Sequence, residues 1–194
     1  MILQPIQLQL KDGRQAVLRS PEVADAADLL AYITKACGET EFLARYPEEW
    51  ASMTLEREQA WVQNRRESPS TLAIVCFVDG KLAGNCEVMF HTGMKTSHRA
   101  TIAIAILQDY WGLGIGSAMF EQMIAAARKH GIMIMELEFI EGNHRARALY
   151  EKYGFEIVGK KPNAIRQRDG SLLDEYMMQK YLKSQRKEID HVPV

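Results

Sequence analysis

Apolar and polar residues alternate in two short runs at the beginning of the chain. Residues 6–10 (IQLQL) and 16–19 (AVLR) show this period of two, which is typical of half-buried strands, and the turn pair Asp12-Gly13 lies between them. The pattern therefore predicts that the chain opens with a β-hairpin.

The spacing of apolar residues then changes to that of helices. Ser20 before Pro21 is a typical helix start, and apolar residues recur every three or four positions as far as Gly38. A second helix is expected from Thr54 to the Ser-Pro-Ser break that begins at residue 68. Between the two helices, residues 38–50 form a predicted loop rich in glutamate.

The middle of the chain contains longer β-rich runs. Residues 71–90 divide into two strands around Asp79-Gly80, which predicts a second hairpin. Residues 99–107 (RATIAIAIL) form a third run that is too rich in isoleucine for an exposed strand. We therefore expect these strands to lie at the centre of the sheet.

Helices and strands alternate in the remainder of the chain. An apolar-faced helix is expected over residues 116–129, and Asn143 caps another helix that Gly154 ends. Residues 160–174 contain Pro162 and an Asp-Gly pair, which predicts a loop or short hairpin projecting from one end of the sheet. Strands are expected around these segments at residues 132–139, 155–160 and 175–182.

The composition is that of a single-domain globular protein. The chain has 194 residues, 47% of them hydrophobic, and a formal net charge of −1. We expect one domain over residues 1–194 that ends in a disordered tail at residues 184–194. The balanced charge argues against binding to nucleic-acid phosphates, and no run resembles a membrane span or signal peptide. A cytoplasmic protein without nucleic-acid or membrane partners is expected.

The cysteines and histidines do not form a recognisable catalytic or metal-binding pattern. Cys37, Cys76 and Cys86 lack CxxC spacing, and we interpret them as reduced core residues. His91, His98 and His144 lack partners at metal-ligand or triad spacing, so no metal is expected.

Residues 109–120 (DYWGLGIGSAMF) are the segment most indicative of function. They follow an isoleucine-rich strand and open a helix, so the alternate glycines allow a sharp bend that exposes successive backbone N–H groups. Such a turn at a helix N-terminus can bind a phosphate or pyrophosphate. The spacing fits neither the P-loop pattern GxxxxGK[ST] nor the dinucleotide-binding pattern GxGxxG. A glycine-rich turn that binds no ligand is an open alternative.

The same segment resembles the acyl-CoA pyrophosphate loop of GNAT N-acyltransferases, whose pattern is Gln/Arg-x-x-Gly-x-Gly/Ala. Gly114 and Gly116 match this pattern, and Trp111 stands where it has Gln or Arg. A second segment, residues 143–155 (NHRARALYEKYGF), resembles the later motif of that family. The resemblance implies an α/β fold with a mixed, mostly antiparallel sheet of six to seven strands, flanked by about four helices, within residues 14–183.

The resemblance also implies acetyl-CoA as cosubstrate and assigns residues to it. Asn143 is expected to bind the pantetheine arm, and the backbone of the central strand is expected to bind its amides. The residues that the resemblance assigns to acetyl-CoA are Ile104, Ala105, Ile106, Trp111, Gly112, Leu113, Gly114, Ile115, Gly116, Ser117 and Asn143.

Two catalytic roles follow from the same resemblance. Tyr150 is expected to return a proton to the departing thiolate, and Glu138 is the candidate general base. Glu136, two residues earlier on the same strand face, and Glu39 and Glu41 of the acidic loop are candidates for contact with the acceptor. Periodicity alone favours a core aromatic at Tyr150, and the glutamates can be a solvated surface.

The predicted reaction is direct acetyl transfer to the primary amine of a small molecule or peptide, by an enzyme that can form a homodimer. Two alternatives remain open at this point. One is a non-catalytic acyl-CoA-binding regulatory module, and the other is a nucleotide-binding α/β protein.

Overall fold

A computed structural model describes residues 1–182, which form one eight-stranded sheet with the strand order β1-β2-β3-β4-β5-β6-β8-β7. Every neighbouring pair is antiparallel except β5 and β6, which are parallel. The strands are β1 (Ile6–Gln9), β2 (Gln15–Arg19), β3 (Thr71–Val78), β4 (Lys81–Phe90), β5 (Arg99–Ile106), β6 (Ile134–Ile140), β7 (Glu156–Arg166) and β8 (Leu172–Tyr181).

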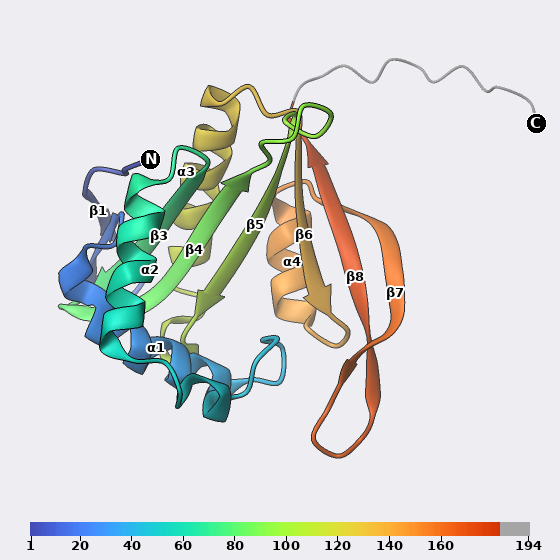
Figure 1. The fold of residues 1–194 in the computed structure, drawn as a ribbon, viewed down its shortest axis with the longest axis horizontal. Coiled ribbons are helices and arrows are strands. Elements are labelled where there is room, and N and C mark those ends of the chain that lie inside the picture. The colour runs from blue at the N-terminus through green and yellow to red at the C-terminus, as the bar shows by residue number, and fades with distance from the viewer. Residues whose placement is uncertain (183–194) are drawn as a thin grey trace, which may run out of the picture.

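Four α-helices cover the two faces of the sheet (Figure 1). They are α1 (Ala26–Glu39), α2 (Leu55–Glu67), α3 (Ile115–Lys129) and α4 (His144–Lys152). One apolar core joins α3 and α4 to the sheet through residues such as Phe120 and Leu137, and a second joins α1 and α2 through Leu29 and Val62. The sheet is thus covered on both faces, and the two helix pairs lie on opposite sides of it.

The parallel pairing of β5 with β6 is short, and the two strands separate where it ends. Cα pairing runs from Arg99 with Ile134 to Thr101 with Glu136 and then stops, after which the two strands diverge (Figure 1). Beyond Thr101, the edge of β5 that faces β6 has no strand partner within residues 1–182. The divergence leaves an opening that passes through the sheet from one face to the other.

Most of the elements predicted from the sequence are confirmed. The hairpins at Asp12-Gly13 and Asp79-Gly80 form, the apolar face of α3 is buried, and β4 and β5 lie at the centre of the sheet. The sheet has eight strands rather than six to seven, because both strands of the opening hairpin pair within it. The projecting segment after residue 160 is a long hairpin, since β7 continues to Arg166 and β8 begins at Leu172.

The predicted start of the first helix is wrong. Ser20 does not cap it: its hydroxyl accepts a hydrogen bond from the Leu3 amide at 2.9 Å and donates one to the Ala73 carbonyl at 3.0 Å. A 3₁₀ turn, Val23–Asp25, comes first, and α1 begins at Ala26. The serine therefore ties the N-terminal segment to β3 instead of starting a helix.

The three cysteines are free and buried, as expected, whereas the tail predicted at residues 184–194 lies outside the described residues. No helix within residues 1–182 is long and apolar enough to cross a membrane.

Candidate active site

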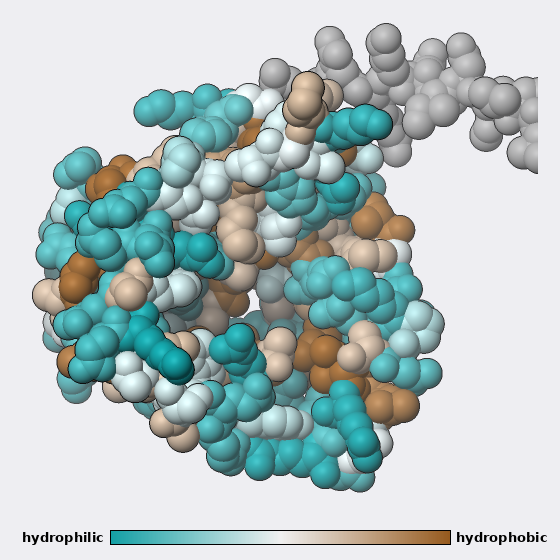
Figure 2. Space-filling view, viewed as in Figure 1, coloured by the Kyte–Doolittle hydropathy of each residue, from teal (hydrophilic) through white to brown (hydrophobic). Residues whose placement is uncertain are grey.

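A cleft of about 720 Å³ occupies the gap where β5 and β6 diverge. Figure 2 shows a hollow in the middle of the face that carries α1 and α2, and the strands on either side of the divergence line it. Ile102, Ile104 and Leu137 pack into the core on the α3 and α4 side, while Thr101, Ala103 and Glu138 alternate with them and face the other side. The cleft can therefore be reached from both faces of the sheet.

The glycine-rich loop lies at the α3 end of this cleft. Gly112 and Gly114 have φ values of 79° and 102°, in the left-handed region that glycine adopts without strain. The first helical hydrogen bond of α3 runs from the Ala118 amide to the Gly114 carbonyl, and the six amides from Gly112 to Ser117 have no acceptor within residues 1–182. Six successive unpaired donors that lead into the N-terminus of a 15-residue helix can bind an anion.

Trp111 supports this loop through its indole ring. Its Nε1 donates a hydrogen bond to the Ile106 carbonyl at 2.7 Å, and the guanidinium of Arg145 lies 4.7 Å above the ring. Arg145 also lies beside Gly112 and lines the cleft. Trp111 thus closes the turn between β5 and the loop, and Arg145 supplies a positive charge beside the unpaired amides.

Asn143 and Tyr150 both line the cleft from α4. Asn143 caps the helix, since its Oδ1 accepts a hydrogen bond from the Ala146 amide at 3.1 Å. The ring of Tyr150 packs against Phe120 and Phe139, and its hydroxyl has no hydrogen-bond partner within residues 1–182. Burial raises the pKa of Tyr150 to about 12, so this hydroxyl is a protonated donor at neutral pH.

Glu138 lies on the opposite side of the cleft, the side that carries α1 and α2. Its carboxylate lines the cleft and accepts a hydrogen bond from Lys161 Nζ at 2.5 Å, and the same ammonium lies 3.0 Å from Glu175 of β8. Pattern reasoning missed Lys161 and Glu175. They lie on β7 and β8, 23 and 37 residues after Glu138 in the sequence, and only the pairing of the strands brings them to its carboxylate.

The other acidic candidates lie in different surroundings. Glu136 lies where β5 and β6 still pair, and Arg99 and His91 contact its carboxylate. Glu39 lines the cleft, and its carboxylate accepts a hydrogen bond from the Gln108 amide at 2.7 Å. Glu41 is exposed and does not line the cleft. Of the loop residues predicted to contact acetyl-CoA, Leu113 alone does not line the cleft.

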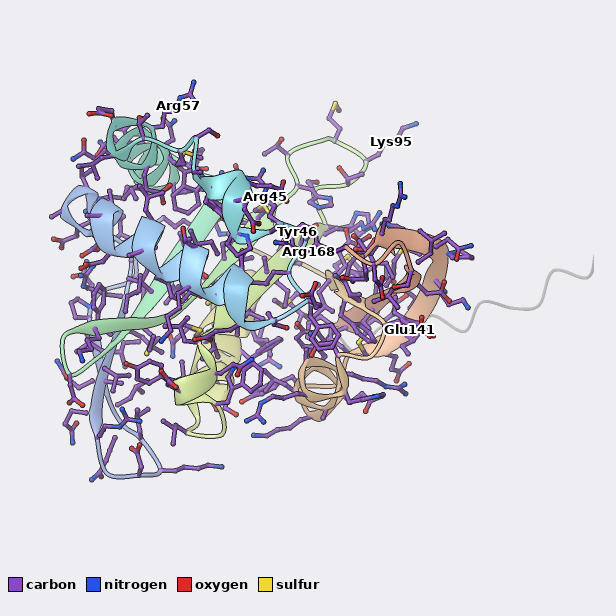
Figure 3. All side chains as sticks on the ribbon, turned by 90° about the horizontal axis from the view of Figure 1, so that it is seen from below. Arg45, Tyr46, Arg57, Lys95, Glu141 and Arg168 are labelled. Carbon is purple, nitrogen blue, oxygen red and sulfur yellow. The ribbon has the colours of Figure 1, made fainter. Side chains whose placement is uncertain are left out.

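The segment between α1 and α2, part of which lines the cleft, meets the β7–β8 hairpin. Arg168 of the hairpin donates a hydrogen bond to Glu48 at 2.6 Å and lies 4.1 Å above the ring of Tyr46 (Figure 3). Tyr46 in turn approaches Gln167, with 3.4 Å between the hydroxyl and the amide oxygen. These contacts form a bridge, defined by Tyr46, Glu48, Gln167 and Arg168, that joins the segment between α1 and α2 to the β7–β8 hairpin.

Tyr32 of α1 is a further residue that pattern reasoning missed. Its hydroxyl donates a hydrogen bond to the Ala105 carbonyl at 2.7 Å and accepts one from the backbone N–H of Asn85 at 3.2 Å. Asn85 and Ala105 are directly opposite each other on β4 and β5. The hydroxyl thus stands between the two strands and fixes β5 where it lines the cleft. In the sequence, Tyr32 is one apolar position among several on a helix face.

A model of the acetyltransferase (GNAT) family matches residues 39–155 of the chain. The chain belongs to the GNAT family. The match contains the glycine-rich loop, Glu138, Asn143 and Tyr150. This GNAT protein is therefore an N-acetyltransferase, as its sequence predicted, and acetyl-CoA is its acetyl donor.

Proteins of known structure or activity resemble this GNAT chain over most of its length. It is 26% identical over 168 residues to the L-methionine sulfoximine/L-methionine sulfone acetyltransferase of Pseudomonas aeruginosa, covering 84% of this chain and 93% of that protein. A GNAT acetyltransferase from Streptococcus pneumoniae superimposes with a TM-score of 0.79 at 28% identity, over 86% of this chain and 99% of the other. The fold is also shared with yncA of Salmonella typhimurium, solved with its cofactor acetyl-CoA (TM-score 0.75, 18% identity, 88% and 96% coverage).

The residues of the cleft fit acetyl-CoA. The unpaired amides of the glycine-rich loop and the Arg145 guanidinium suit its pyrophosphate, and the unpaired edge of β5 beyond Thr101 offers backbone groups to an amide-containing arm. The cleft is also large enough to bury an extended ligand.

Proposed function

We propose that this N-acetyltransferase transfers the acetyl group of acetyl-CoA directly to the primary amine of a small molecule. Glu138 is the general base, and the hydroxyl of Tyr150 donates a hydrogen bond to the departing sulfur. One observation carries the proposal: a single opening through the sheet joins the unpartnered hydroxyl of Tyr150 on one side to the carboxylate of Glu138 on the other. Donor and acceptor can thus approach from opposite faces and meet between β5 and β6.

Each proposed role uses a group with suitable chemistry. Acetyl-CoA supplies an acetyl group activated as a thioester. Glu138 accepts the proton of the attacking amine, directly or through water, and the hydroxyl of Tyr150 donates a hydrogen bond where negative charge develops on sulfur. The backbone of Ile104 to Ile106 holds the donor in place along the unpaired edge of β5.

Direct transfer agrees with the state of the cysteines. Burial raises the pKa of Cys76 to about 12 and raises that of Cys86 well above its ordinary value, so neither forms a thiolate nucleophile at neutral pH. Burial also raises the pKa of the Cys37 thiol, and Trp50 Nε1 donates a hydrogen bond to its sulfur at 3.3 Å. None of the three is therefore suited to carry the acetyl group.

The bridge between Tyr46 and Arg168 supports an acceptor of small size. The bridge holds the segment that supplies Phe42, Leu43 and Ala44 to the lining of the cleft, and a segment tethered there favours a small molecule over a polypeptide chain. The Pseudomonas relative, named for L-methionine sulfoximine and L-methionine sulfone, also acts on small amines. A cytoplasmic location and a homodimer, both expected from the sequence, stay predictions.

A panel of amines tests the proposed reaction. Release of free thiol from acetyl-CoA is measured with L-methionine sulfoximine, other amino acids, polyamines and an alanine-terminated peptide. We expect thiol release with at least one small amine and less with the peptide. Thermal stabilisation by CoA without thiol release for any amine would instead favour a non-catalytic acyl-CoA-binding module.

The pH dependence of kcat/KM tests the role of Glu138. A general base must be deprotonated, so kcat/KM of the wild type falls on the acid side, and Glu138→Gln is expected to lose that acid limb together with most of its activity. An acid limb that persists unchanged in Glu138→Gln would assign the proton transfer to another group.

A further inference from the structure

Two carboxylates on the acceptor side of the cleft hold one primary ammonium between them. Lys161 Nζ lies 2.5 Å from Glu138 Oε1 and 3.0 Å from Glu175 Oε2. Glu138 pairs with Met177 across β6 and β8, so Glu175, two residues before Met177, is its diagonal neighbour on the same face of the sheet. The register of these strands therefore builds a two-carboxylate site that already binds an R–NH₃⁺ group.

The charges around the cleft favour a cation at this position. Both Glu138 and Glu175 line the cleft, and neither carboxylate has another hydrogen-bond or ion-pair partner within residues 1–182. The basic side chains that line the cleft, Lys11 and Arg145, belong to the end occupied by the glycine-rich loop. The acceptor end thus presents uncompensated negative charge once Lys161 is withdrawn.

Lys161 is placed so that it can withdraw. It lies on β7, the edge strand of the sheet, its side chain is 47% exposed, and it does not itself line the cleft. The pairing of β7 with β8 becomes irregular immediately after Lys161 and resumes at Ile165. An exposed ion pair contributes little free energy, so release of the Lys161 ammonium into water is easily offset by a bound ligand.

We infer that Glu175 and Glu138 together form the ammonium-binding subsite of the acceptor, and that the Lys161 ammonium fills this subsite until the acceptor amine displaces it. The inference rests on the proposed function and extends it by naming a second acceptor-binding carboxylate and an internal competitor. Displacement also frees Glu138 from Lys161, so that its carboxylate meets the acceptor amine whose proton it is to accept.

Binding of a probe ligand tests the inference without turnover. The probe is L-methionine amide, a primary ammonium without a carboxylate, and its matched control is N-acetyl-L-methionine amide, which lacks the ammonium. Both are titrated by calorimetry into the full chain saturated with CoA. We expect Glu175→Gln to weaken binding of the probe about 10-fold through loss of a charge-assisted hydrogen bond, and Glu175→Asp to restore part of it.

Lys161→Met is expected to act in the opposite direction. Removal of an internal competitor should tighten binding of the probe about fivefold, the factor that an exposed ion pair can supply. Lys95→Met is the matched control, because Lys95 is exposed on the loop between β4 and β5, at the opposite end of the sheet from the β7–β8 turn (Figure 1), and should leave binding unchanged. The N-acetyl control ligand should respond to none of these substitutions.

Three results would overturn the inference: unchanged probe binding in Glu175→Gln, weaker binding in Lys161→Met, or an equal response of the N-acetyl ligand. Stabilisation of each variant by CoA confirms that it is folded. If the binding pattern holds but acetyl-CoA is never consumed with any amine, the proposed function fails while the subsite stands. If amines are acetylated but the pattern is absent, the subsite fails alone.

Discussion

Tyr150→Phe removes one oxygen atom from the cleft and little else. The ring centroid lies 5.7 Å from that of Phe120 and 6.2 Å from that of Phe139, and these contacts do not involve the hydroxyl. Because the hydroxyl has no partner within residues 1–182, its removal breaks no hydrogen bond of the described fold. We therefore expect the melting temperature to stay within about 2 °C of the wild type.

The effect on turnover follows from the pKa of the tyrosine. Burial raises this pKa to about 12, whereas an ordinary thiol has a pKa of about 8.5. Complete proton transfer from Tyr150 to a thiolate is therefore uphill, and its main contribution is a hydrogen bond to the developing charge on sulfur. Such a bond to a charged group contributes about 1.5–3 kcal/mol, so kcat should fall about 10- to 100-fold in Tyr150→Phe.

The assay is steady-state thiol release at saturating acetyl-CoA and amine between pH 6 and 9. Tyr150 stays protonated throughout this range, so the shape of the pH profile should be the same in Tyr150→Phe and in the wild type. Tyr153→Phe is the matched control, since its hydroxyl donates to the Ser117 carbonyl at 3.0 Å and does not line the cleft. It should lower stability slightly and leave kcat unchanged. Undiminished turnover in Tyr150→Phe, or an equal loss in Tyr153→Phe, would refute the reasoning.

Three further substitutions test the loop and the stability of the fold. Gly114→Ala places a Cβ on a backbone with φ of 102°, at a cost of about 1–2 kcal/mol, so thermal stabilisation by CoA should weaken. Burial raises the pKa of Asp25, but hydrogen bonds from Arg19 and from the Glu22 amide outweigh this effect and hold the pKa below its usual value. Asp25→Asn should therefore lower the free energy of unfolding by about 2–4 kcal/mol at pH 7. The difference from the wild type should shrink below pH 4, because protonation of the Asp25 carboxylate removes the same stabilisation from the wild type. Burial raises the pKa of Glu58, so the ionised carboxylate destabilises the folded state at high pH. Glu58→Gln should raise the free energy of unfolding by up to about 1 kcal/mol at pH 8 and leave it unchanged at pH 4. Denaturant unfolding at both pH values measures this difference.

The elements that carry the glycine-rich loop, Asn143 and Tyr150 could be predicted from the sequence because their determinants are local. The glycine turn follows a strand and opens a helix within about fifteen residues, and the cap at Asn143 and the ring of Tyr150 share one short helix. Turn chemistry likewise predicted the hairpins at Asp12-Gly13 and Asp79-Gly80. Periods of two and 3.6 residues were sufficient for these elements.

The surroundings of Glu138 could not be predicted in this way, because contacts between distant segments build them. Arg168 and Glu48 are 120 residues apart, and Lys161 reaches Glu138 only because β8 inserts between β6 and β7. The cleft itself depends on the pairing of β5 and β6 ending at Thr101, which no residue pattern marks. Ser20 could not be placed from the sequence for the same reason. Its residue type is typical of a helix cap, but its hydroxyl makes long-range hydrogen bonds with Leu3 and Ala73 instead.

The central claim is that acetyl passes directly from acetyl-CoA to an amine within the cleft between β5 and β6. The most direct measurement mixes enzyme in excess over acetyl-CoA, with and without the best amine of the panel, and follows free thiol and N-acetylated amine together in a single turnover. We predict no thiol release without the amine and, with it, thiol and acetylated amine at equal rates and in a 1:1 ratio. A burst of thiol in the absence of amine, with acetyl left on the protein, would contradict direct transfer.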